Sequence, residues 1–166
     1  MNAGITAGLI TGTILTVIQL TTSYMTIAGS SATGMPIIGC LIASIAGIIS
    51  NWMYAKGYDL TYPIGKGALL GVFSGIITSI VTFYLSLFWT KVIDTGMNEA
   101  IIEATLKSFE DQGLSQEEID MAQSLIPDPN SLVGLIITFL LALAMYVVIN
   151  LISGIISAKI FAKEEE

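Results

Sequence analysis

Few residues of this chain could carry nucleophilic or acid–base chemistry. The 166 residues include no histidine and one cysteine, Cys40, which stands inside an apolar run. A nucleophile needs a general base within hydrogen-bond reach, and the sequence offers no such pair. Cys40 cannot form a disulfide within the chain, and its simplest role is that of a small packing residue. We therefore expect no catalytic residues and no cofactor, and an enzymatic function is the least favoured reading.

Carboxylates gather in one segment, residues 92–130. Nine acids stand there against Lys91 at its edge and Lys107 within it, and this excess equals the net charge of −7 of the whole chain. These acids do not follow the alternating, glycine-centred pattern of an EF-hand loop, so we expect no metal site. The segment then presents either a solvated acidic face or a docking surface for a basic partner or a cation. Nucleic acid is an unfavoured partner because the isoelectric point is 4.3 and no basic patch is present.

Uncharged polar residues inside the apolar runs form the third group. Gln19 and Asn150 stand within such runs, and Thr11 and Thr16 belong to a threonine-rich first run. Side-chain amides can hydrogen-bond between membrane helices, which stabilises them by about 1–2 kcal/mol. The same four side chains could instead line a crevice for a neutral solute. Ion- and proton-coupled transporters usually carry charged or histidine side chains inside their spans, and these runs contain no Asp, Glu, Lys, Arg or His.

The elements that must position these residues are long apolar runs. Hydrophobic residues make up 54% of the chain and charged residues 11%. A helix needs about 20 apolar residues to span a bilayer, and four runs qualify, at 3–27, 36–55, 67–90 and 132–157. A soluble helical core is disfavoured because its helices would need a charged face. A cleaved signal peptide is also disfavoured, because no positive residue precedes the first run.

Between the third and fourth runs the sequence predicts two short helices. The first covers about 97–111, and the second begins at Ser115, where Ser115 and Glu118 form a capping box. We expect an all-α integral membrane protein with four transmembrane helices and a short acidic helical hairpin between spans three and four. The predicted segments are a first transmembrane hairpin at 1–56, a loop at 57–66, a third span at 67–91, the acidic hairpin at 92–130, a fourth span at 131–158 and a charged tail at 159–166.

Lysines set the predicted orientation, because the chain has no arginine. Four of the six lysines flank the 56–66 loop or follow the last span, against Lys91 and Lys107 on the other side. By the positive-inside rule both termini lie in the cytoplasm and the acidic hairpin lies outside. The aromatic residues expected at the two interfaces are Trp52, Tyr54 and Tyr58 inside, and Tyr24 and Trp89 outside.

Glycine recurs at every fourth position, and the pattern repeats along the chain. GITAGLITG at 4–12 aligns with GALLGVFSG at 67–75, and IAGIISNWMYAK at 45–56 matches ISGIISAKIFAK at 152–163 in seven of twelve positions. The sequence therefore predicts a duplicated two-helix hairpin whose copies run parallel. Small residues let helices approach closely, so these ladders either pack the bundle or form a seam with a second copy or a membrane partner. The expected packing glycines are Gly4, Gly8, Gly12, Gly39, Gly47, Gly67, Gly71, Gly75, Gly134 and Gly154.

The order of these features resembles a known family. Glycine-stepped spans, the loop GYDLTYPIGKG, the acidic insertion ATLKSFEDQGLSQEEIDMAQ, a last span and a charged tail are similar to domain of unknown function 4199. Members of that family are small four-span membrane proteins, mostly from the Bacteroidota. The resemblance covers nearly the whole chain, and it implies a multi-pass protein of the bacterial inner membrane. Because the family has no known function, it supplies no active site.

Two functional hypotheses remain open at this point. The first is a small non-enzymatic membrane protein with a structural or partner-binding role, surrounded by lipid. The alternative is a small channel or transporter for a neutral or weakly polar solute. A solvent-filled crevice lined by Thr11, Thr16, Gln19 and Asn150 would favour the transporter, and a dry, closed bundle would favour the first reading. A second copy or a complex partner would bind through the glycine faces or the acidic hairpin.

Overall fold

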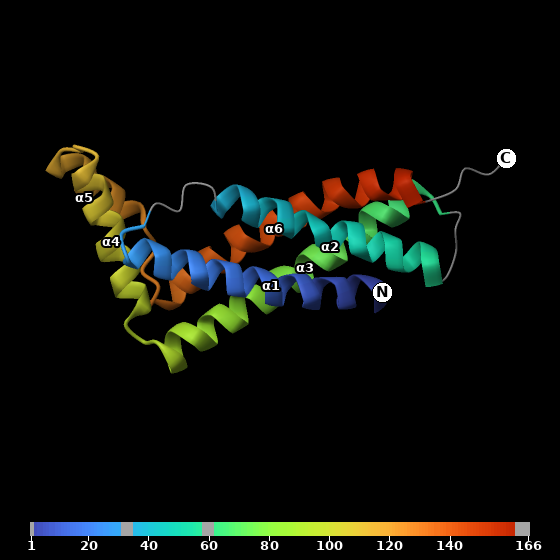
Figure 1. Ribbon diagram of the computed structural model, residues 1–166, viewed down its shortest axis with the longest axis horizontal. Helices are drawn as coiled ribbons and strands as arrows, with labels where there is room; N and C mark the ends of the chain where they lie inside the picture. Colours follow the sequence, from blue (N-terminus) through green and yellow to red (C-terminus); the bar gives the residue numbers. More distant parts are fainter. Residues whose placement is uncertain (1, 31–34, 58–61, 162–166) are drawn as a thin grey trace.

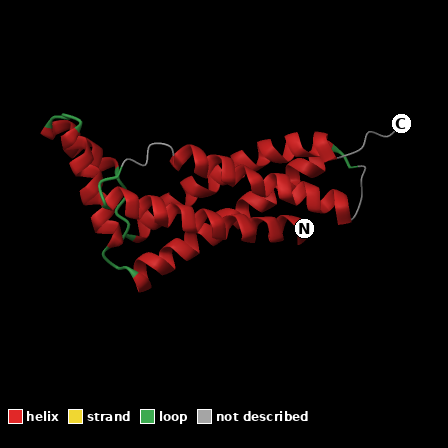
Figure 2. Cartoon of the chain, in the orientation of Figure 1, coloured by secondary structure: helices red, strands yellow, loops and turns green. Residues whose placement is uncertain are grey.

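The chain is all-helical in a computed structural model, which describes residues 2–30, 35–57 and 62–161 (Figures 1 and 2). These residues contain six α-helices and no strand. The elements are α1 (Asn2–Ile27), α2 (Met35–Gly57), α3 (Ile64–Phe88), the short π-helix η1 (Trp89–Ile93), α4 (Met97–Asp111), α5 (Gln116–Leu125) and α6 (Leu132–Phe161).

Four of these helices are long and apolar enough to cross a membrane. They are α1, residues Ile37–Gly57 of α2, α3 together with η1, and α6. The predicted spans are therefore confirmed as helices, although α3 begins three residues before the predicted 67 and α6 continues four residues past the predicted 157. Lys66 and Lys159 lie inside the helical ends. A lysine within one turn of a membrane interface can extend its ammonium group into water, so these positions are compatible with a span.

The four long helices form one bundle with α3 near its centre. Helices α1 and α3 run in one direction and α2 and α6 in the other, so the start of α1 and the end of α6 lie at the same end (Figure 1). Helix α3 packs against α1, α2 and α6, and α2 packs against both α1 and α6. Helices α4 and α5 lie at the opposite end of the bundle, as expected for an insertion between two spans.

The interior of the bundle is made of small residues and its surface of large ones. Every buried residue of α3 except Leu70 is glycine, serine or threonine. Large aliphatic side chains face outward, for example Val17, Leu41 and Leu141, which are 60–64% exposed. In lipid a helix gains nothing by hiding leucine, whereas small residues allow close backbone contact. The burial pattern is therefore that of a multi-pass membrane protein.

The acidic segment folds as the sequence predicts. Helices α4 and α5 occupy it, and the capping box is present, with the Glu118 backbone N–H pointing to Ser115 Oγ and the Ser115 N–H donating to Glu118 Oε2 at 2.8 Å. Met97 at the start of α4 is 2% exposed and Ile119 in α5 is 4% exposed. Helix α4 contacts α1, so the hairpin is attached to the bundle through its first helix.

A hydrogen-bond chain fixes this attachment next to the π-helix. Trp89 Nε1 donates to Tyr24 Oη at 3.1 Å, and Tyr24 Oη donates to Asp94 Oδ2 at 2.7 Å. Tyr24 and Trp89, expected to share one interface, thus touch at the same end of the bundle. At the other end, the ammonium groups of Lys56 and Lys66 lie over aromatic rings, those of Trp52 and Tyr54. Tyr58 lies outside the described residues.

Candidate functional site

The glycine ladder of α1 packs on α3. A Cβ atom added at Gly8 would lie 2.6 Å from Ile77 Cβ, and one at Gly12 would lie 2.8 Å from Val81 Cβ. Gly4 is looser, with its nearest neighbours at 3.4 Å. Real Cβ atoms do not approach other carbons below about 3.5 Å without losing van der Waals contact energy. This ladder therefore contacts the other predicted hairpin repeat.

The equivalent ladder of α3 has a different partner. A Cβ at Gly71 would overlap the carbonyl oxygen of Asn150, and one at Gly75 would lie 2.7 Å from the carbonyl oxygen of Tyr146. A Cβ added at Gly67 would overlap the Cβ of Ala158. Each of these partners belongs to α6, the second helix of the same predicted repeat. The two ladders match in sequence, but they do not face each other.

The remaining glycines expected to pack divide into two groups. A Cβ added at Gly47 would overlap Ser153 and Asn150, so Gly47 belongs to the α2–α6 contact. A Cβ added at Gly154 would lie 2.7 Å from the Gly67 carbonyl oxygen, so Gly154 belongs to the α3–α6 contact. Gly134 faces Asp128 in the loop before α6. At Gly39 an added Cβ would meet nothing within 4 Å, so this glycine packs no helix among the described residues.

A buried amide network joins α2 to α6 at this seam. Asn150 is fully buried, its Oδ1 accepts from the Gly47 N–H at 2.7 Å, and its Nδ2 donates to the Tyr146 carbonyl at 2.9 Å. The hydroxyl of Ser157 also donates to the Gly47 carbonyl, at 3.4 Å. Asn150 therefore links two helices through the backbone of the partner rather than through Gln19.

Asn51 extends the network from α2 to α3. This side chain is fully buried, and its Nδ2 donates to the carbonyls of Gly47 at 2.9 Å and Gly67 at 3.2 Å. Tyr62 Oη donates to Asn51 Oδ1 at 3.0 Å. Burial, reinforced by the nearby Tyr54, raises the pKa of Tyr62, so this phenol remains a donor at neutral pH. Sequence reasoning missed Asn51, although an amide inside the second apolar run was a readable signal.

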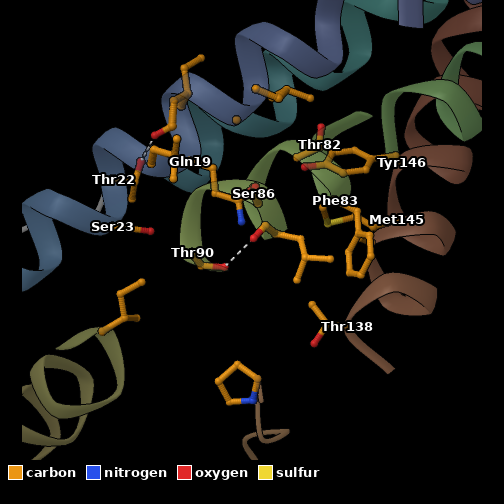
Figure 3. A pocket seen from close by; sticks show the side chains of 18 of the residues that line it. Gln19, Thr22, Ser23, Thr82, Phe83, Ser86, Thr90, Thr138, Met145 and Tyr146 are labelled. Atoms are coloured by element: carbon orange, nitrogen blue, oxygen red, sulfur yellow. Dashed lines mark hydrogen bonds between the residues drawn. The ribbon is translucent and has the colours of Figure 1, made fainter. Parts of the chain in front are cut away.

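The other end of the bundle holds a cavity of about 540 Å³ (Figure 3). Gln19, Thr22 and Ser23 of α1 border it opposite Ser86 of α3 and Thr90 of η1, and α6 closes a further side. The start of α4 and Pro129 lie at its mouth, and the contact of Leu15, Ala43 and Tyr146 forms its floor. Its lining residues are Leu15, Ile18, Gln19, Leu20, Thr22, Ser23, Gly39, Cys40, Ala43, Thr82, Phe83, Ser86, Leu87, Thr90, Met97, Asn98, Ile101, Pro129, Leu135, Thr138, Ala142, Met145 and Tyr146.

The four side chains expected to share a crevice do not come together. Gln19 lines the cavity, but Asn150 lies in the amide network beyond its floor. Thr11 is 2% exposed, and Thr16 donates to the Gly12 carbonyl of its own helix at 2.8 Å. The cavity is bordered instead by residues that sequence reasoning did not group, because helix separation leaves no periodic signal. The cavity forms because the long helices lie further apart towards the α4 end of the bundle.

The acidic hairpin offers no ready-made metal site. Within residues 2–30, 35–57 and 62–161, no three His, Cys, Asp or Glu side chains are grouped so that they could hold an ion. The resemblance noted from the sequence stays a prediction. No family model, curated protein or solved structure matches this chain.

Proposed function

We propose that this chain is a non-enzymatic membrane protein with a structural or partner-binding role, located in a bacterial inner membrane with both termini in the cytoplasm. The observation that carries the proposal is the continuous seam along α3. Glycines and buried amides from Gly4 to Gly154 bring the four spans together, and the buried hydroxyls along the seam donate to backbone carbonyls, as Thr78 does to Gly8 and Thr82 does to Gly12. Such an interior supports a stable scaffold rather than a pathway.

The distribution of glycine also limits where a partner binds. Gly8, Gly12, Gly47 and Gly71 are in contact within one chain, so these four glycines are not available to a second copy. The acidic hairpin is the better candidate surface, because its carboxylates are exposed while Met97 and Ile119 are buried. A surface of this charge favours a basic partner, and salt weakens such an interaction.

A second candidate function, transport of a neutral or weakly polar solute, is favoured by the cavity. The two functions require different behaviour of the contact that forms the floor of the cavity. Leu15, Ala43 and Tyr146 separate the cavity from the other half of the bundle. A transporter must open this contact, whereas a scaffold keeps it closed.

Purification of the full chain in mild detergent, followed by native mass spectrometry, tests the proposal. We expect a co-purifying chain at low salt that is lost at high salt. A variant with Glu103, Glu110, Glu117 and Asp120 changed to Gln or Asn should lose it at low salt as well. All four carboxylates are exposed in the structure. The matched control changes Lys56 and Lys66, at the opposite end, to Gln. Uptake of sugars or amino acids by reconstituted vesicles, abolished by substitution at Tyr146, would instead support transport.

A further inference from the structure

We propose that the cavity holds one acyl chain of a phospholipid from the surrounding membrane leaflet, with the ester region of the lipid at the mouth near α4. This binding site is separate from the proposed scaffold role, and neither depends on the other. Three observations carry the inference: the length of the cavity, its uncharged and mainly apolar lining, and one buried hydroxyl that has no protein partner.

The cavity is as long as one leaflet is thick. It extends from Leu15 to Ser23 along α1 and from Tyr146 to Leu135 along α6. At 1.5 Å per residue these stretches measure about 12 Å and about 16 Å. The hydrocarbon core of a bilayer is about 30 Å thick, so one leaflet contributes about 15 Å. A single hydrocarbon chain fits this dimension.

The lining is mainly apolar, with polar groups at intervals along it. Thr22, Ser23, Thr90 and Asn98 lie at the mouth, near the Tyr24–Trp89 pair that we expect at the membrane interface. Towards the floor Leu15, Phe83, Ala142 and Met145 are apolar, and Thr82 and Tyr146 add hydroxyl groups. Every lining residue is uncharged, which disfavours an ionic ligand inside the cavity.

One polar group of the lining has no partner among the described residues. Ser86 Oγ is buried without a hydrogen bond, whereas the Gln19 amide, which also lines the cavity, is exposed. A polar group without a partner in hydrocarbon is costly. The ester carbonyls and glycerol oxygens of a phospholipid can accept hydrogen bonds at this depth.

Photo-crosslinking tests the site directly. The full chain is reconstituted in vesicles of phosphatidylethanolamine and phosphatidylglycerol that include phosphatidylglycerol with a diazirine at the end of one acyl chain. We expect adducts on Leu15, which is 4% exposed and lines the cavity, besides those on Leu41, which is 63% exposed on the outside of the bundle. Adducts on Leu41 without any on Leu15 would overturn the proposal, and would indicate a cavity filled by water alone.

Gly39 provides a way to fill the cavity without a clash. It lines the cavity, and a Cβ there meets nothing within 4 Å. Gly39→Leu should lower the yield of Leu15 adducts by about tenfold and leave Leu41 adducts unchanged. Gly65→Leu, at a second open glycine far from the cavity, is the matched control and should change neither.

Thermal unfolding supplies an independent readout. In lipid-free detergent Gly39→Leu should unfold at or above the temperature of the parent, because the side chain occupies empty space. Added phosphatidylglycerol should raise the Tm of the parent and of Gly65→Leu but not that of Gly39→Leu. If Gly39→Leu does not insert, Thr138→Phe fills the cavity from α6, where Thr138 is exposed. Unchanged Leu15 labelling in the folded filled variant would contradict the proposal.

Discussion

Gly71 lies at a very close contact between helices α3 and α6. A methyl group added there overlaps the carbonyl oxygen of Asn150, which belongs to a rigid helix and cannot turn away. Gly71→Ala should therefore lower the free energy of unfolding by about 1–3 kcal/mol or more, the usual cost of overpacking. Unfolding in detergent, followed by circular dichroism, measures this loss.

Gly65→Ala is the matched control for that substitution. Both glycines lie in α3, but nothing lies within 4 Å of a Cβ at Gly65. Alanine favours a helix over glycine by about 1 kcal/mol, so the control should be neutral or stabilising. If Gly71→Ala unfolds at the same denaturant concentration as Gly65→Ala, the α3–α6 contact is looser than described.

The hydrogen bond between Tyr62 and Asn51 can be isolated by a double-mutant cycle. Tyr62→Phe removes the hydroxyl that donates to Asn51 Oδ1, and Asn51→Ala removes the acceptor. We expect a coupling energy of about 0.5–1.5 kcal/mol, the usual net contribution of a hydrogen bond to stability. Strictly additive losses would show that the two groups do not interact in the membrane. Tyr84→Phe, whose ring is exposed, serves as the control.

At the residue scale the sequence indicated which residues are small and polar, but not what they touch. The spacing of Gly4, Gly8 and Gly12 places them on one face of α1. Nothing in that spacing says that this face meets Ile77 and Val81. The identity of a partner depends on the rotation of each helix about its axis, which is decided by all contacts together. Gly39 has the same spacing as the others and packs nothing.

Among the elements, α4 begins with a side chain that is almost completely buried, that of Met97. Met97 is 2% exposed and is among the largest fully buried side chains. Met97→Ala should cost about 2–5 kcal/mol of local stability, as for other buried methionines. Hydrogen exchange of the amides in the first turns of α4 should become faster, while that of α3 stays unchanged. Met121→Ala in α5 removes a 63% exposed side chain and should leave exchange as in the parent.

The capping box makes α5 sensitive to acid. Hydrogen bonds from the backbone and side chain of Ser115 lower the pKa of Glu118 below its ordinary value of 4.5. The carboxylate is thus favoured by folding, so its contribution is present above pH 4.5 and is lost as the pH falls through the folded pKa. Carbon-13 NMR of the Glu118 carboxyl should show the lowered pKa, and the amide shifts of α5 should lose helical character over the same range.

Ser115→Ala is the control for this titration. Without the hydroxyl and its backbone geometry, the pKa of Glu118 should return towards the ordinary value, and the start of α5 should fray at neutral pH. An unchanged Glu118 titration in this variant would show that another group causes the shift.

The elements themselves were largely predictable, and the spaces between them were not. Apolar run length predicted the four spans, and the Ser115–Glu118 signature placed the start of α5. The π-helix after Phe88 was not predicted, because one extra residue per turn produces no distinct pattern over five residues. The cavity was missed for a similar reason: it arises where α1, α3 and α6 separate, and separation is a property of the assembled bundle.

For the whole molecule, the two ends of the bundle should face opposite sides of the membrane. The start of α1 and the end of α6 share one end, and α4 and α5 occupy the other (Figure 1). After replacement of Cys40 by alanine, Gln112→Cys at the tip of the acidic hairpin should react with a membrane-impermeant maleimide in intact cells. Asp59→Cys should react only after the cells are opened. Labelling of Asp59→Cys from outside would invert the proposed orientation.

The outward position of the large side chains determines which sequence changes this protein can accumulate. In a water-soluble protein, selection acts most strongly on hydrophobicity inside and least strongly on composition outside. Here the inner face of α3 tolerates few increases in volume, whereas Leu41 or Val17 can exchange with any aliphatic residue that lipid accepts. A library of random variants should therefore divide into two regimes: inner positions limited by size, and outer positions limited only by polarity. Under neutral drift, the surface of such a protein would lose recognisable similarity first, while its inner spacing persisted.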